Sequence, residues 1–110
     1  MSQFSVYKNK SVKSNHQYPY IIDVQSDLLS DFQSRVIMPI ASRTERNSQV
    51  KKLTPEIIIN ELRYVVITTS IASVDVKKLK EQDLVLQADF IRDAIVSATD
   101  TLILGSWRTF

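Results

Sequence analysis

The sequence predicts a mainly β fold in which short antiparallel strands are followed by one C-terminal helix. Up to about residue 76, apolar residues alternate with polar ones or form short β-branched runs, as half-buried strands do. From residue 84 onward the apolar spacing changes to that of a helix. No internal repeat, low-complexity tract or linker interrupts the 110 residues, so we expect a single domain over residues 1–110.

The first two strands are predicted by strict alternation. Side chains that recur every second residue share one face of a strand, and here that face is apolar. The polar and basic segment 8–17 between the two strands is expected to form a loop or hairpin tip. The apolar residues are Phe4 and Val6 in the first strand, and Tyr18, Tyr20, Ile22 and Val24 in the second.

A compact apolar strand is predicted at Val36–Ile40. Proline has no N–H to donate to a ladder, so Pro39 indicates that this strand ends there or lies at a sheet edge. The segment 42–52 that follows is expected to be a loop.

A tight hairpin is predicted farther along the chain. Two β-branched runs, Ile57–Ile59 and Leu62–Thr69, flank the dipeptide Asn60–Glu61. A two-residue loop between such runs favours a hairpin. Another short strand is predicted at Ser73–Val76.

A long helix is predicted over about residues 84–104. Apolar residues spaced 4, 3, 4, 3 and 4 apart form one stripe, which faces either the core or a second subunit. Gly105, the only glycine, reaches positive φ without steric cost and marks the helix end, followed by a short tail over 105–110. The stripe consists of Leu84, Ala88, Ile91, Ile95, Ala98 and Leu102.

Composition excludes several classes of protein. A net charge of +2, from 14 basic and 12 acidic residues, is too balanced to indicate DNA binding by phosphate neutralisation. The absence of cysteine excludes disulfides and thiolate zinc sites. No apolar run approaches the roughly 20 residues that cross a bilayer, and residues 1–10 lack a signal-peptide core. We therefore expect a cytoplasmic protein without metal, cofactor or membrane partner.

Signals for catalysis are weak. His16 is the only histidine, so a two-histidine metal site cannot be built, and it has no clear partner for a triad. Asp23 and Asp27 are interpreted as turn or loop anchors, and no catalytic residue is expected. The remaining cations lack interleaved aromatic residues and are interpreted as solubilising surface charges. They are Arg43, Arg46, Lys51, Lys52, Lys77, Lys78 and Lys80.

Three segments carry motifs in a fixed order. Residues 18–41, YPYIIDVQSDLLSDFQSRVIMPIA, contain D-V-Q-S-D, two aliphatic residues, a polar loop, a basic residue and an apolar strand. Residues 65–76, VVITTSIASVDV, and the opening QFSVYKNK, residues 3–10, are the other two. Together they resemble the CcdB family of toxins from toxin-antitoxin systems, in which the motifs read D-V-Q-S-D, M-M-T-T-x-M-A-S-V-P-V and Q-F-x-V-Y. Asp75 stands where many members have proline.

The resemblance implies both a fold and a function. The fold is an SH3-like, partly open antiparallel barrel with a small extra hairpin and a C-terminal helix, and two chains form a symmetric homodimer. The protein would not be an enzyme but a toxin that binds the DNA gyrase A subunit and traps the gyrase–DNA cleavage complex. A cognate CcdA-like antitoxin would neutralise it, and contact with operator DNA would occur only through the antitoxin complex.

The resemblance also implies site residues. The helix end and the two aliphatic residues after D-V-Q-S-D supply the gyrase contacts of the family, and a tryptophan after the helix offers an additional aromatic anchor. The two aliphatic residues are predicted to lie on a strand with only one of them exposed. The gyrase-binding residues are then Leu28, Leu29, Asp100, Ile103, Leu104, Gly105, Ser106 and Trp107, and the antitoxin-binding residues are Lys8, Lys10 and Lys13.

Several alternatives stay open at this point. A second register aligns Ile91–Ile95, IRDAI, with the family's I-K-N-A-I and leaves the gyrase residues unassigned. The related MazF and Kid toxins cut single-stranded RNA on the same barrel architecture, so a ribonuclease is the alternative function. A third possibility is a homologue that has lost toxicity and only binds antitoxin.

Overall fold

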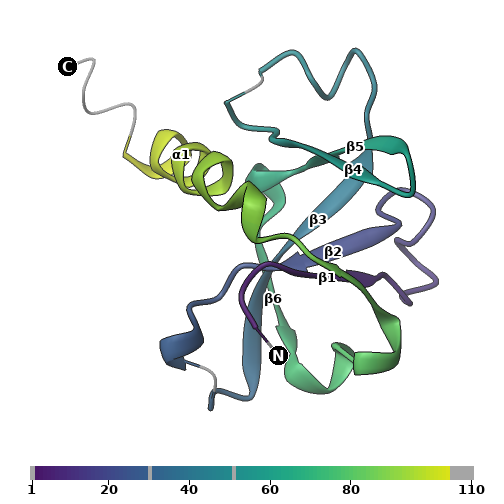
Figure 1. The fold of residues 1–110 in the computed structure, drawn as a ribbon, viewed down its shortest axis with the longest axis vertical. Helices are drawn as coiled ribbons and strands as arrows, with labels where there is room; N and C mark the ends of the chain where they lie inside the picture. Colours follow the sequence, from purple (N-terminus) through teal and green to yellow (C-terminus); the bar gives the residue numbers. More distant parts are fainter. Residues whose placement is uncertain (1, 30, 51, 105–110) are drawn as a thin grey trace.

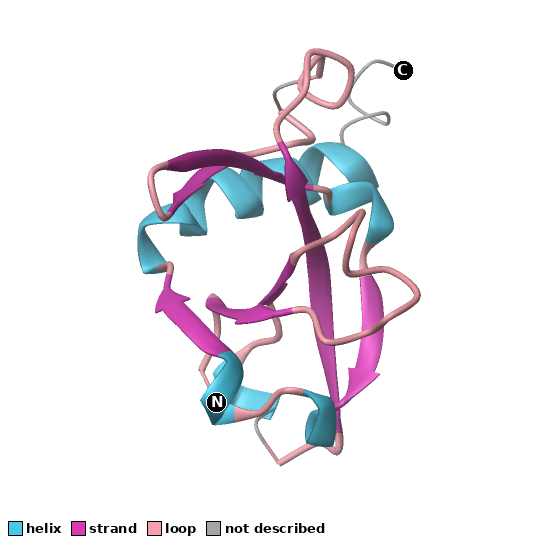
Figure 2. Cartoon of the chain, turned by 90° about the vertical axis from the view of Figure 1, so that its right-hand side faces the viewer, coloured by secondary structure: helices cyan, strands magenta, loops and turns pink. Residues whose placement is uncertain are grey.

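The computed structural model describes residues 2–29, 31–50 and 52–104. Its main feature is a seven-stranded antiparallel sheet, curled into a half-barrel, with one α-helix near the C-terminal end (Figures 1 and 2). The predicted fold class, a partly open antiparallel barrel with a C-terminal helix, is confirmed.

The central strand of the sheet is β3. The hydrogen-bonded order is β4-β5-β3-β2-β1-β7. Strand β6 also pairs with β3, along residues 34–37, whereas β5 pairs with residues 40–42 of the same strand. The strands are β1 Ser5–Lys8, β2 Tyr20–Asp23, β3 Ser34–Ser42, β4 Glu56–Ile59, β5 Leu62–Val66, β6 Ala72–Asp75 and β7 Leu84–Gln87. The helices are η1 Asp27–Leu29, η2 Thr68–Ser70, η3 Val76–Lys78, η4 Glu81–Asp83 and η5 Asp89–Ile91, all 3₁₀, and α1 Arg92–Ile103.

Pro39 lies inside β3, the longest strand, so the prediction that it ends a strand or lies at an edge is wrong. Its carbonyl accepts a hydrogen bond from the Ile67 N–H at 2.9 Å. The N–H and C=O of one residue in a strand point the same way, so the missing N–H of Pro39 faces that side too. There β3 changes partner, from β6 up to Ile37 to β5 from Ile40 onward. Proline is tolerated because no ladder donor is needed in this gap.

The predicted hairpin between β4 and β5 is confirmed. Ile59 pairs with Leu62, and the two residues between them both have positive φ, 51° at Asn60 and 69° at Glu61. Two consecutive left-handed residues are the signature of a type I′ turn, whose twist matches that of the flanking strands. Asn tolerates this conformation well, whereas Glu61 adopts it against the steric demand of its Cβ.

Replacing Glu61 by glycine is therefore expected to stabilise the protein. Removing the Cβ relieves a steric cost of about 1 to 2 kcal/mol, part of which is lost to the greater freedom of glycine in the unfolded chain. We expect a net gain of about 0.5 to 1 kcal/mol in the free energy of unfolding, measured by urea denaturation. Glu61→Ala, which retains the Cβ, is the control and should show no comparable gain.

The C-terminal helix begins later than predicted. Residues 84–87, expected to be helical, form β7, which pairs with the otherwise open edge of β1 through Ser5, Val6 and Tyr7. The strand is followed by η5, and α1 then runs only from Arg92 to Ile103. The middle of the predicted stripe is confirmed as buried, but its two ends are solvent-exposed, Leu84 by 44% and Leu102 by 38%.

The main core lies between the curled sheet and α1. Tyr20 packs edge-on against Tyr64 within it, with ring centroids 5.2 Å apart. Ile95 closes this core from the helix side. A second, smaller cluster of Tyr7, Ile37 and Leu79 lies apart from it. The buried residues of the main core are Phe4, Val6, Ile22, Met38, Ile40, Ile57, Ile59, Tyr64, Val66, Ala88, Ile91 and Ile95.

Candidate functional site

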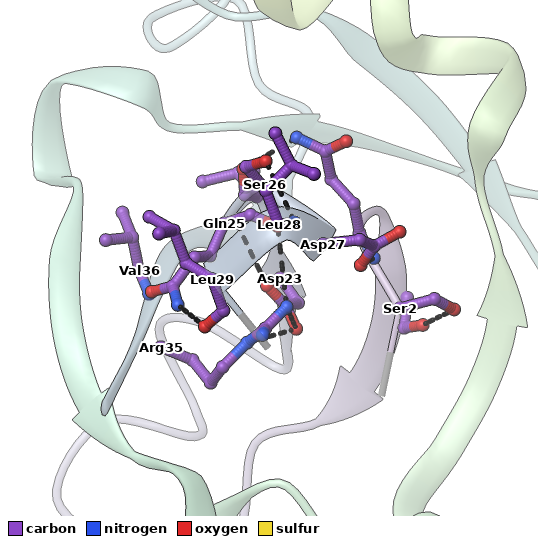
Figure 3. A network of polar contacts seen from close by, with 12 residues as sticks. Ser2, Asp23, Gln25, Ser26, Asp27, Leu28, Leu29, Arg35 and Val36 are labelled. Carbon is purple, nitrogen blue, oxygen red and sulfur yellow. Dashed lines mark hydrogen bonds and ion pairs between the residues drawn. The ribbon is translucent and has the colours of Figure 1, made fainter. Parts of the chain in front are cut away.

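The first residue of the D-V-Q-S-D segment, Asp23, forms a buried ion pair with Arg35. Asp23, at the end of β2, and Arg35, in β3, are both fully buried. The Arg35 Nε donates a hydrogen bond to Asp23 Oδ2 at 2.9 Å, and Arg35 Nη2 forms an ion pair with the same oxygen at 2.8 Å (Figure 3). Arg35 Nη2 also reaches the Gln25 carbonyl at 3.4 Å. The predicted role of Asp23 as an anchor of this loop agrees with these contacts.

Gln25 forms hydrogen bonds to the end of β2, to β3 and to η1. Its backbone N–H donates to Asp23 Oδ1 at 3.0 Å, and its side-chain oxygen accepts from the Val36 N–H at 3.0 Å. Its side-chain nitrogen donates to the Leu29 carbonyl at 2.9 Å (Figure 3). The side chain therefore fixes the position of η1 relative to β3.

Asp27 fixes the other end of the same turn. Its Oδ1 accepts from the Gln3 N–H at 2.8 Å, and the Gln3 side chain donates to the Val24 carbonyl at 3.1 Å. The N-terminal segment is thus bonded to the loop that carries Leu28 and Leu29. Hydrogen bonds of Asp23, Gln25 and Asp27 thus anchor the loop at both of its ends.

Burial is the main influence on the Asp23 carboxyl. Burial raises its pKa, while the hydrogen bonds from Arg35 and from the Gln25 N–H lower it, and the net direction is upward. The ionised pair is therefore not a strong source of stability in itself. It is a constraint that must remain intact because neither charge has access to water.

Leu28 and Leu29 form the outward face of η1. They lie in a 3₁₀ turn and not in a strand, and both are exposed, Leu28 by 94% and Leu29 by 43%. The prediction that only one of them would be exposed is wrong, because the alternation of a strand does not apply to a turn. Two adjacent exposed leucines on an anchored turn are available to a partner.

An apolar groove of about 710 Å³ runs between η1, β3 and α1. Leu29 and Phe32 line it on the η1 side, and Ile71, which lies between η2 and β6, also lines it. The helix contributes Val96, Thr99, Asp100 and Ile103, spaced so that they share one helical face, together with the adjoining Leu104. Val24, Val36, Met38 and Ile95 supply further apolar lining.

The groove brings together residues that the sequence places more than 70 positions apart. Leu29, Asp100, Ile103 and Leu104 were predicted as site residues, and all four line it. Leu28 does not line it and lies on the same turn beside it. The predicted residues Gly105, Ser106 and Trp107 lie outside the described residues.

Three exposed apolar residues that line the groove were not predicted as site residues. Phe32 is 57% exposed, Val96 57% and Ile71 43%. Val96 lies on the helix face that contained Asp100 and Ile103, so helical periodicity could have identified it. Phe32 and Ile71 have no such signal, because they reach the groove through tertiary packing.

A second groove, of about 1080 Å³, is lined by six lysines. The predicted antitoxin-binding residues Lys8, Lys10 and Lys13 supply one side of it. The other side is formed by Lys77, Lys78 and Lys80, which the sequence analysis interpreted only as solubilising charges. We call this the lysine groove.

The described part of the chain contains neither a metal-binding cluster nor a membrane-spanning helix. His16 is exposed in the loop after β1. Among residues 2–29, 31–50 and 52–104, no group of three histidine, aspartate or glutamate side chains is placed to hold a metal ion. Among the same residues, no helix is long and apolar enough to cross a membrane.

The described chain is a curled antiparallel half-barrel with an apolar groove beside its C-terminal helix, and the hydrogen-bonded turn that carries Leu29 forms one side of that groove. The family described as CcdB protein matches this chain over residues 3–105. The chain therefore belongs to the CcdB family, the toxins of toxin-antitoxin systems.

Proposed function

We propose that this chain is a toxin that binds the A subunit of DNA gyrase and traps the gyrase–DNA cleavage complex. The observation that supports this most is the meeting of η1 and the end of α1 at one apolar groove. These are the two segments through which the CcdB resemblance implies gyrase contact. The proposed gyrase-binding residues among those described are Leu28, Leu29, Asp100, Ile103 and Leu104.

The chemistry of the groove suits a protein partner. Several of its apolar lining side chains are exposed, Ile103 most of all at 65%, and they are carried by a hydrogen-bonded turn and by a helix. A patch of this kind is typical of interaction sites, because binding removes it from water. Asp100 is the only ionisable residue that lines the groove within the described part of the chain.

Two further partners belong to this proposal. A CcdA-like antitoxin would bind through Lys8, Lys10 and Lys13, and operator DNA would be contacted only through that complex. We also propose a symmetric homodimer, which sedimentation equilibrium should reveal as twice the 12.6 kDa chain mass. A species that stays at the monomer mass at micromolar concentration would contradict the dimer.

A plasmid cleavage assay tests the gyrase proposal. Purified protein, gyrase, ATP and supercoiled plasmid are incubated and then denatured, and a single-stranded RNA is treated with the same preparation. We expect linear DNA to accumulate with added protein while the RNA remains intact. Cleaved RNA with intact plasmid would assign the chain to the ribonuclease branch, and no reaction with either substrate would indicate a homologue without toxicity.

A further inference from the structure

The lysine groove concentrates positive charge on two separate walls. Lys8 ends β1 and Lys10 and Lys13 belong to the loop after it, whereas Lys77, Lys78 and Lys80 belong to η3 and the segment after it. All six are exposed. Within the described chain, Asp83 is the only acidic residue that lines the groove, and it pairs with Lys10 at 3.6 Å. The groove is thus strongly positive although the whole chain carries only +2.

The first wall is held by Asn9. Its side-chain nitrogen donates to the Tyr18 carbonyl at 2.8 Å and to Ser14 Oγ at 3.0 Å. Its side-chain oxygen accepts from the Ser11 N–H at 3.0 Å. These bonds close the loop on itself and place its lysines at the rim.

The second wall is held by a cap and an apolar anchor. Asp75 Oδ1 accepts from the Lys77 N–H at 2.9 Å and caps η3. Leu79 is buried in the smaller core cluster with Tyr7 and Ile37. Because Leu79 points inward between Lys78 and Lys80, its neighbours on either side remain at the surface.

The floor between the walls is apolar. It is formed by Ile21 of β2, Ile37 and Pro39 of β3, and Ala72 and Val74 of β6. An aliphatic floor with cationic walls matches an extended peptide that carries carboxylates on its flanks and aliphatic side chains toward the floor. Nucleic acid fits less well, because Tyr18 is the only aromatic residue among the described lining residues and offers no run of stacking platforms.

We propose that the lysine groove binds an extended acidic peptide and that Lys77, Lys78 and Lys80 form half of its binding surface. This inference rests on the proposed function, because an acidic antitoxin tail is the partner that such a peptide would represent. The inference adds a second wall and an apolar floor to a site otherwise assigned to one loop. A peptide that contacts both walls and the floor needs carboxylates for the lysines and aliphatic side chains for the floor.

Fluorescence anisotropy of a labelled synthetic peptide tests the inference without gyrase. The probe has about ten residues, roughly 33 Å when extended, with glutamate alternating with leucine or valine. The comparison probes are a glutamate–serine peptide of equal charge and a single-stranded oligonucleotide. We expect the alternating apolar peptide to bind at least about tenfold more tightly than either of them.

Two charge-reversal variants test the second wall. Lys78→Glu/Lys80→Glu is compared with Arg46→Glu/Lys52→Glu, which makes the same change in net charge at exposed positions outside the groove. The first should weaken the peptide by at least about tenfold, and the second by less than about threefold in the same salt. Thermal melting of both variants should stay close to that of the unmodified chain.

The inference is overturned if both variants weaken binding equally, since that would show attraction by overall charge. It is also overturned if the glutamate–serine peptide or the oligonucleotide binds as tightly as the apolar probe. If the chain binds the peptide but does not poison gyrase, the inference about the lysine groove stands and only the gyrase proposal fails. The two failures are therefore distinguishable.

Discussion

Asp23→Asn is expected to lower the free energy of unfolding by about 3 to 5 kcal/mol, one of the two largest effects predicted for this chain. The substitution removes the negative charge and leaves the Arg35 guanidinium, which is fully buried, without its counterion. The amide oxygen introduced there can still accept from the Gln25 N–H, so the effect reports the charge and not that hydrogen bond. Urea denaturation monitored by circular dichroism gives the measurement.

The control is the double variant Asp23→Asn/Arg35→Met, in which both charges are gone. Because replacing a buried ion pair by neutral groups is often close to neutral, it should recover most of the lost stability. A double variant as unstable as the sum of the two single variants would show that the pair is not coupled. A single variant that costs less than about 1 kcal/mol would contradict the buried position of Arg35.

Arg35→Met alone should make stability depend on pH more strongly than it does in the unmodified chain. Removing the guanidinium takes away a cause that lowers the pKa of Asp23, so burial raises that pKa further. A carboxyl whose pKa is higher in the folded chain binds its proton more tightly there. Stability is then greatest at low pH and falls as the pH rises from the ordinary value of 3.8 through the folded-state pKa. The deficit relative to the unmodified chain should be larger at about pH 8 than at about pH 5.

Ile103→Lys is expected to reduce gyrase-dependent plasmid cleavage by at least about tenfold at equal protein concentration. Ile103 lies in the last turn of α1, is 65% exposed and lines the apolar groove, so a charge there must be desolvated when a partner binds. The folded chain should tolerate the change, because the new side chain remains in water and a cation is favourable near a helix C-terminus.

Leu62→Lys is the matched control. Leu62 is 61% exposed but lies at the β4–β5 hairpin, outside the lining of the groove. It should leave plasmid cleavage within about twofold and unfolding within about 0.5 kcal/mol of the unmodified chain. Equal loss of plasmid cleavage in both variants, or full cleavage with Ile103→Lys, would contradict the proposal that gyrase binds at the apolar groove.

Local sequence signals predicted most elements of the fold. The hairpin at Asn60–Glu61 follows from two β-branched runs separated by two residues, and the alternation around Val6 and Ile22 identified β1 and β2. The start of the helix could not be predicted. Residues 84–87 fit a helical stripe equally well, and only the open edge of β1, which is a tertiary feature, selects a strand there.

The candidate site was predicted in part for a similar reason. Leu29, Asp100, Ile103 and Leu104 came from family motifs and proved to line one groove. The second wall of the lysine groove was missed, because Lys77, Lys78 and Lys80 carry no motif. Their position is set by Leu79, which is buried between them and packs in a cluster with Ile37 of β3 and Val74 of β6.

Pro39 has a further consequence for how uniquely β3 can be aligned. Val36 and Met38 of β3 line the apolar groove, whereas Ile37 and Pro39 form the floor of the lysine groove. A shift of β3 by one residue would exchange these two sets and destroy both surfaces together. In that misaligned state, Pro39 would face β2 at a position that requires an N–H donor, and the ladder would lose a bond. Pro39, a residue type that usually interrupts strands, thus disfavours the shifted alignment of β3.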